Sequence, residues 1–146
     1  MRPVKKFEEY LKTDVVRIQS VDKSRAESLK KESLQTEKVL ISIINSVGLT
    51  NENANTIITI AYDIIMKNIR SKMILSGYNS SGRGAHEAEV SYLRVLGFNE
   101  KDVQFCDQLR YFRNGIMYYG KIFDKKYAEK TIDFLKNKVS YKKLFQ

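Results

Sequence analysis

Apolar residues recur at intervals of three and four positions along most of this chain, and that spacing predicts α-helices almost throughout. The first long helix is expected to begin after Ser20 or Asp22, either of which can cap it, and to end near Val47, just before Gly48. Four apolar positions at helical spacing share one face of this helix: Leu40, Ile43, Ile44 and Val47.

Residues 51–75 form the most apolar segment of the chain. Its many β-branched residues are typical of a strand, but its length favours a helix. Four of its apolar positions also follow helical spacing: Ile57, Ala61, Ile64 and Ile65. Because apolar residues cover more than half of the helix circumference, we place this helix at the centre of a bundle.

The one clear linker is the stretch "SGYNSSGRGAH", residues 76–86, because its small residues interrupt the periodicity. A shorter helix is expected from about Ala85 to Leu96, which Gly97 ends. Asn99 then caps a helix that runs to about Tyr119, with Gly120 as its carboxyl-terminal stop. A last helix follows a cap at Asp124, and its apolar positions are Ala128, Ile132, Leu135 and Val139.

The chain of 146 residues has the size of one domain and shows neither hairpin signatures nor internal repeats. We therefore predict a single domain over residues 1–146, an all-α, up-and-down bundle of about five helices. A single cysteine excludes an internal disulfide and indicates a reducing compartment. With one cysteine and one histidine, a structural zinc site is effectively excluded, and we expect neither a metal nor a cofactor.

No secretory signal is visible in the first residues, "MRPVKKFEEYLK", because they lack an apolar central region. The longest aliphatic run, residues 39–44, is far shorter than the roughly 20 residues of a membrane span. We therefore expect a soluble, cytoplasmic protein without a membrane partner.

The chain is strongly basic, with 26 Lys and Arg, 17 Asp and Glu, and a net charge of +9. The excess is largest in residues 121–146, which contain eight basic and three acidic residues. Such an excess favours polyanion partners whose binding weakens as salt rises. A lysine-rich helix face in contact with water is an equally good interpretation, because net charge says nothing about specificity.

The stretch "RYFRNGIMYYG", residues 110–120, concentrates polar residues on one side of its helix. With successive residues about 100° apart, Arg110, Asn114 and Tyr118 form one strip. Arg113 flanks this strip, beside Cys106 and Met117. The opposite stripe is expected to face the core and contains Phe105, Leu109, Phe112, Ile116 and Tyr119.

A strip of this composition has three possible roles. The planar guanidinium of arginine matches phosphate oxygens in bidentate geometry, and tyrosine rings can stack on bases. Arginine and tyrosine are also enriched at subunit interfaces. Spacing alone leaves an ordinary surface, an interface and a ligand site open.

The same stretch, together with the preceding "SGYNSSGRGAHEAEVSYLRVLGF", resembles the HEPN domain, a family of prokaryotic helical proteins often paired with minimal nucleotidyltransferases. The family hallmark is an arginine followed by a polar residue, with a histidine four to six residues after the arginine. The resemblance implies a homodimer whose two motifs face one cleft that takes RNA or a nucleotide. It also implies a toxin–antitoxin-type system, with a minimal nucleotidyltransferase as a possible partner.

In this chain the arginine–asparagine element of the motif falls on Arg113 and Asn114, and the histidine position falls on Tyr118. Family members with the intact motif commonly act as metal-independent ribonucleases, in which the histidine supplies acid–base chemistry. A tyrosine, with an ordinary pKa near 10, is a poor general base at neutral pH. The resemblance therefore implies binding without efficient cleavage: Arg110 and Arg113 hold phosphate, Asn114 hydrogen-bonds phosphate or caps the facing helix, and Tyr118 stacks or donates.

Two further residues are candidates for the same site. His86, the only histidine, either holds the preceding loop through a hydrogen bond or enters the Arg113 cleft in place of the motif histidine. Arg83 lies in the linker, from which it could reach a phosphate. The sequence thus leaves two rivals to a binding module: a ribonuclease that uses Arg113 with Tyr118 or His86, and a purely structural docking partner of a nucleotidyltransferase.

Overall fold

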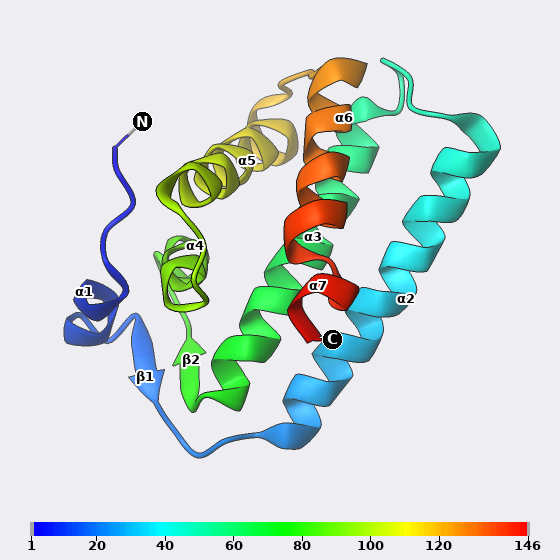
Figure 1. Ribbon diagram of the computed structural model, residues 1–146. Coiled ribbons are helices and arrows are strands. Elements are labelled where there is room, and N and C mark those ends of the chain that lie inside the picture. Colours follow the sequence, from blue (N-terminus) through cyan, green and yellow to red (C-terminus); the bar gives the residue numbers. More distant parts are fainter. Residues whose placement is uncertain (1, 146) are drawn as a thin grey trace.

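The computed structural model describes residues 2–145 and confirms the predicted all-α bundle (Figure 1). The helices and strands, in chain order, are α1 (Phe7–Lys12), β1 (Val16–Ile18), α2 (Lys23–Val47), α3 (Ala54–Leu75), β2 (Tyr78–Ser80), α4 (Ala85–Val95), α5 (Glu100–Tyr119), α6 (Lys125–Phe134), a π-helical turn η1 (Leu135–Val139) and α7 (Tyr141–Phe145). Among residues 2–145, no helix is both long enough and apolar enough to cross a bilayer.

Helix α3 is the central helix of the bundle, as its pattern predicts. The four residues that define its apolar spacing are fully buried: Ile57, Ala61, Ile64 and Ile65. Helices α2, α4, α5 and α6 all pack against α3. Two buried polar side chains add to this packing, because Ser71 donates to the Ala26 carbonyl of α2 and Asn68 donates to the Val139 carbonyl of η1.

Helix α2 begins and ends where the sequence predicts. The Asp22 carboxylate accepts a hydrogen bond from the Arg25 backbone N–H at 2.9 Å, which satisfies one of the free donors of the first turn. Gly48 follows the last turn with φ 73°, a value that favours glycine. On the expected apolar face, Leu40 is buried, but Val47 is exposed. Val47, in the last turn of α2, is 64% exposed and does not belong to the core.

Two features of the first 80 residues were not predicted. The short helix α1 precedes β1, and β1 pairs antiparallel with β2 so that Val16 lies opposite Ser80. Strand β2 therefore occupies part of the segment that the sequence presents as a linker. Strands of three residues are too short to show an alternating pattern, so sequence reasoning found no signal for them.

Helix α5 carries the polar strip, and its caps are as predicted. Asn99 accepts a hydrogen bond from the Asp102 backbone N–H at 2.9 Å, and Gly120 ends the helix with φ 65°. Leu109 of the expected core stripe is fully buried, but Tyr119 is 78% exposed. The prediction for Tyr119 is wrong because the last turn of α5, residues 117–120, lies outside the core.

The last predicted helix continues from α6 into η1. Its four predicted core positions are all buried: Ala128, Ile132, Leu135 and Val139. The Asp124 cap is also present, since its carboxylate accepts from the Tyr127 backbone N–H at 3.0 Å. The connection from α5 to α6 is held by Asn55 of α3, which donates to the Lys121 carbonyl and accepts from the Phe123 backbone N–H, both at 2.9 Å.

Candidate functional site

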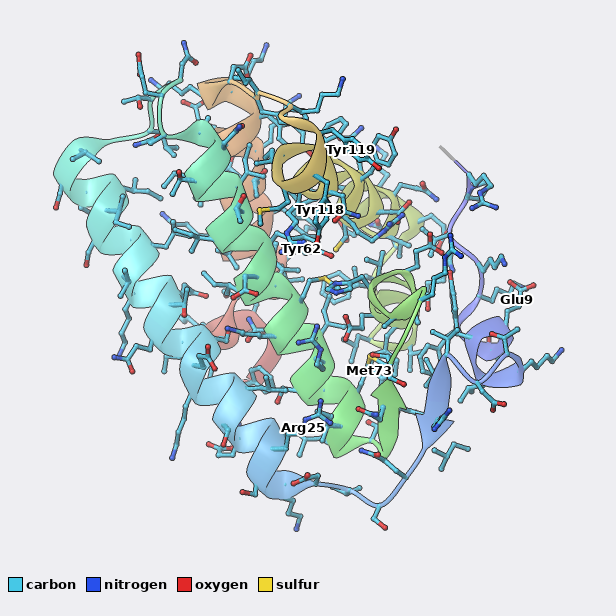
Figure 2. All side chains as sticks on the ribbon, turned by 180° about the vertical axis from the view of Figure 1, so that it is seen from behind. Glu9, Arg25, Tyr62, Met73, Tyr118 and Tyr119 are labelled. Atoms are coloured by element: carbon cyan, nitrogen blue, oxygen red, sulfur yellow. The ribbon has the colours of Figure 1, made fainter. Side chains whose placement is uncertain are left out.

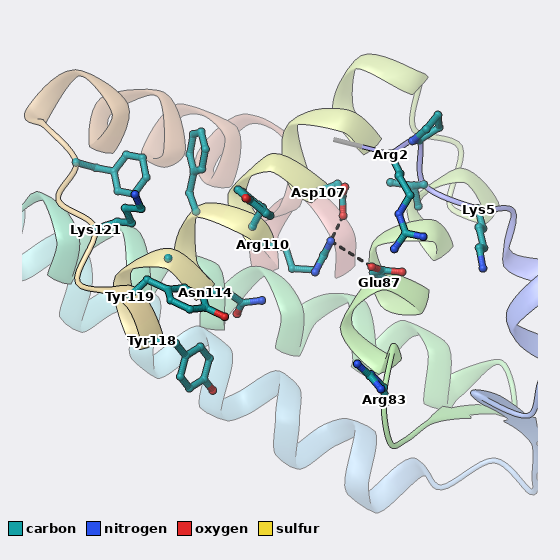
Figure 3. A pocket seen from close by; sticks show the side chains of 16 residues that line it. Arg2, Lys5, Arg83, Glu87, Asp107, Arg110, Asn114, Tyr118, Tyr119 and Lys121 are labelled. Atoms are coloured by element: carbon teal, nitrogen blue, oxygen red, sulfur yellow. Dashed lines mark hydrogen bonds and ion pairs between the residues drawn. The ribbon is translucent and has the colours of Figure 1, made fainter.

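The predicted strip of Arg110, Asn114 and Tyr118 lines one wall of a cleft of about 990 Å³ (Figure 3). Tyr111 and Tyr119, from the same helix, also line it. Phe112 and Tyr119, which the sequence places on the opposite stripe of α5, line the same cleft, so its lining extends beyond the polar strip. All three tyrosines are exposed, so their rings are free to contact a ligand.

The other walls of the cleft come from segments far apart in the sequence. The amino-terminal arm, residues 2–5, contributes Arg2 and Lys5, the loop before α4 contributes Arg83, and the α5–α6 connection contributes Lys121. With Arg110, five cationic side chains line the cleft, against the two carboxylates of Glu87 and Asp107. The lining therefore carries a net charge of +3.

Among residues 2–145, Arg110 is the one cleft cation that forms ion pairs. Its Nε donates to Asp107 at 2.8 Å, and its Nη2 lies 3.4 Å from a Glu87 oxygen. The hydroxyl of Tyr10 donates to the other Glu87 oxygen at 3.2 Å, and burial followed by the Glu87 charge raises the pKa of Tyr10 to about 12. Arg110 thus links α5 to α4 through Glu87, and its charge is less available to a phosphate than that of a free cation.

Arg83, in contrast, is exposed at the tip of its loop. It lies between Gly82 and Gly84, whose φ values of 75° and 88° give the loop a turn that other residues rarely adopt. In Figure 3 Arg83 lies across the cleft from Tyr118. A cation and an aromatic ring thus face each other from different elements.

Arg113 lies on the side of α5 that faces α3, away from the cleft lining. Its guanidinium carbon is 5.4 Å from the centroid of the Tyr62 ring, within the range of a cation–π contact. Its Nε is buried and, among residues 2–145, has no hydrogen-bond acceptor. No carboxylate in the same described part of the chain forms an ion pair with Arg113. Its positive charge is therefore uncompensated.

His86 meets the same tyrosine from α4. Its Nδ1 is hydrogen-bonded to the Tyr62 hydroxyl at 3.1 Å, and about half of its side chain is exposed. The predicted role of holding the preceding loop is wrong, because the partner lies on α3. Burial lowers the pKa of His86, opposed by the charge of Glu89 and reinforced by Arg70, Arg113 and Arg110.

The structure thus separates the predicted residues into two groups. Arg83, Arg110, Asn114 and Tyr118 line the cleft, whereas Arg113 and His86 meet at Tyr62 on the α3 side of α5. Figure 2, seen from behind, places Tyr62 within the bundle and Tyr118 and Tyr119 at the end of α5. Within residues 2–145, no hydrogen bond joins Tyr118 to Arg113 or His86.

Sequence reasoning missed Tyr62 and the amino-terminal arm. Nothing in the position of Tyr62 along its helix marks the histidine and the arginine that it contacts. Arg2 and Lys5 precede the first helix and follow no periodicity, so only the packing of the arm against α4 and α5 reveals their place.

We compared the chain with protein-family models, with curated proteins and with solved structures, and none of them matches it.

Proposed function

We propose that this protein is a HEPN-like module that binds single-stranded RNA or a nucleotide in the cleft along α5. The observation that carries the proposal is the lining of that cleft: five cationic side chains, two carboxylates and three exposed tyrosines around about 990 Å³. Proteins that bind single strands combine a positively charged groove with aromatic rings on which bases stack.

The exposed cations supply the phosphate contacts in this proposal. Four cleft cations are exposed, so their side chains can contact the phosphates of a polynucleotide: Arg2, Lys5, Arg83 and Lys121. Arg113 does not line the cleft itself. Its uncompensated charge lies near the cleft because Asn114, the next residue in the chain, is part of the lining. Stacking on a tyrosine contributes roughly 1–3 kcal/mol per base and requires unpaired bases, which favours a single strand over a duplex.

A homodimer is part of the proposal, with a minimal nucleotidyltransferase of a toxin–antitoxin-type system as a possible further partner. Support comes from the apolar side chains exposed around the end of α5, namely Met117, Tyr118, Tyr119 and Ile122. Exposed apolar groups that gather in one place are typical of a protein–protein interface. A monomer in solution would remove this part of the proposal but not the cleft.

The proposal is tested by the affinity of a labelled single-stranded RNA, measured by fluorescence anisotropy at roughly 50 to 200 mM salt. We expect affinity to fall steeply with salt, and the double variant Arg83→Ala/Lys121→Ala to reduce the slope of log K against log salt by about 1.4, since each phosphate contact to a single strand contributes about 0.7. A duplex of the same sequence is expected to bind more weakly.

The matched control removes one arginine and one lysine outside the cleft, Arg17→Ala/Lys38→Ala. Both residues are exposed, on β1 and α2 respectively. The control should leave affinity and slope nearly unchanged. Equal affinity at low and high salt, or equal effects of the two double variants, would refute binding in this cleft and leave the structural docking module.

The arrangement around Tyr62 supports a second candidate function, metal-independent cleavage of RNA. The lowered pKa keeps His86 neutral at pH 7. When its Nδ1–H donates to the Tyr62 oxygen, its Nε2 carries the lone pair that a general base needs. The uncompensated Arg113, on the face of the same Tyr62 ring, can stabilise the charge that develops on a phosphate.

Cleavage is measured with end-labelled single-stranded RNA in EDTA. In this candidate mechanism, His86→Ala and Arg113→Ala abolish cleavage, and Tyr118→Phe retains it. The rate stays constant at neutral pH and falls only below the ordinary histidine pKa of about 6.5, where His86 becomes protonated. Intact RNA with the wild-type protein excludes this candidate and leaves binding as the function.

A further inference from the structure

The amino-terminal arm, residues 2–5, is a wall of the cleft that belongs to no helix or strand. It supplies two of the five cleft cations, Arg2 and Lys5. In Figure 3 Arg2 lies next to Glu87 and Lys5 lies farther out, both at the end of the cleft away from Tyr118. An irregular segment keeps its side chains in place only where something fixes its backbone.

Arg94, at the end of α4, provides that attachment. Its Nη1 donates to the Lys5 carbonyl at 2.7 Å, and its Nη2 donates to the Val4 carbonyl at 2.9 Å. Glu100, in the first turn of α5, accepts from Arg94 Nε at 2.7 Å and from Nη2 at 2.9 Å. This bidentate pair fixes the plane of the guanidinium, so the directions of its two bonds to the arm are fixed as well.

Apolar packing anchors both the arm and the first residue of α1, Phe7. Val4 is buried, and the Phe7 ring packs edge-on against Tyr92 and Tyr78, with ring centroids 4.9 Å and 5.1 Å away. These contacts hold the position of the arm but do not bond the carbonyls of Val4 and Lys5. Arg94 is the side chain that bonds those carbonyls.

We propose that Arg94 is a positioning residue for ligand binding, which fixes where Arg2 and Lys5 meet the phosphates of the ligand. Arg94 does not line the cleft, so it acts through the arm without touching the ligand. This inference rests on the proposed function, because it assigns a role in the binding of single-stranded RNA.

The test is a comparison of salt slopes with the same labelled RNA. Removal of both arm cations, Arg2→Ala/Lys5→Ala, is expected to reduce the slope by about 1.4. Arg94→Ala is expected to reproduce most of that loss, and adding it to the double variant should cause no further loss. Arg94→Lys, which keeps the charge but not the planar fork, should give an intermediate slope.

Arg25→Ala is the matched control. Arg25 also ties two segments together, since its Nη1 donates to Asn79 of β2 at 3.0 Å, and Figure 2 places it at the end of the molecule opposite Tyr119. The Arg25→Ala variant should have a slightly lower Tm and the same slope of log K against log salt as the wild type.

Two outcomes overturn the inference while the proposed function survives: Arg94→Ala lowers Tm but keeps the wild-type slope, or the double arm variant binds as the wild type does. If the wild-type protein binds no RNA, the proposed function fails, and this inference fails with it before any variant is compared.

Discussion

Replacement of Glu89 by alanine is expected to lower the free energy of unfolding by about 3 kcal/mol. The Glu89 carboxylate is 1% exposed and accepts Arg70 Nε at 2.6 Å, Arg70 Nη2 at 3.1 Å and the Ser80 hydroxyl at 3.0 Å. Its removal leaves the Arg70 guanidinium and the Ser80 hydroxyl without these partners. We take the lower end of the range for buried pairs because Arg70 is a quarter exposed.

Urea or thermal denaturation followed by circular dichroism measures this loss. Glu89→Gln keeps the shape and part of the hydrogen bonding, so its loss should be smaller. Glu129→Ala on α6 is the control, because Glu129 is half exposed and its nearest cation, Lys125, is 3.9 Å away. A surface pair of that kind contributes less than about 1 kcal/mol. Similar losses in Glu89→Ala and Glu129→Ala would contradict the assigned importance of the Arg70–Glu89 pair.

The second large effect is expected at Arg113, with opposite signs for stability and for binding. In the cleavage candidate, where RNA reaches the Tyr62 side of α5, Arg113→Leu should weaken RNA binding by about 2 kcal/mol, roughly 30-fold, because it removes a charged hydrogen-bond donor. It should also raise the free energy of unfolding by about 1 kcal/mol, since the buried Nε–H that lacks an acceptor is removed. The lost cation–π contact with Tyr62 offsets part of that gain.

Anisotropy and urea denaturation on the same protein sample measure both effects. Arg17→Leu on β1 is the matched control, because Arg17 is exposed and lies outside the cleft. It should change neither quantity by much. If Arg113→Leu is strongly destabilised and binds RNA normally, Arg113 has a structural role and the phosphate contact is refuted.

The five longer helices, α2 to α6, were predictable because each is long enough to show its apolar period, whereas the short α1 is not. The centre of the bundle could be identified for the same reason, since apolar residues cover more than half of the circumference of the helix formed by residues 54–75. The exceptions are short or terminal. The three-residue strands show no period, and the last turns of α2 and α5 keep the pattern although Val47 and Tyr119 lie beyond the core.

The site was only partly predictable, because one helix determines some of it and packing determines the rest. The strip of Arg110, Asn114 and Tyr118 follows from helical spacing alone. The pairing of Arg110 with Asp107 was also within reach, since the two lie three residues apart on one helix. The contacts of Arg113 and His86 with Tyr62 could not be predicted, because they depend on how α3, α4 and α5 pack together.

The single cysteine of the chain makes the opening of α5 measurable without any label or substitution. Cys106 lies on α5, is fully buried, and has its thiol pKa raised by burial to about 12. Thiol reagents attack the thiolate, so modification has to await a fluctuation that lifts this helix from its neighbours. The modification rate therefore reports the free energy of that opening, for the same helix that lines the cleft.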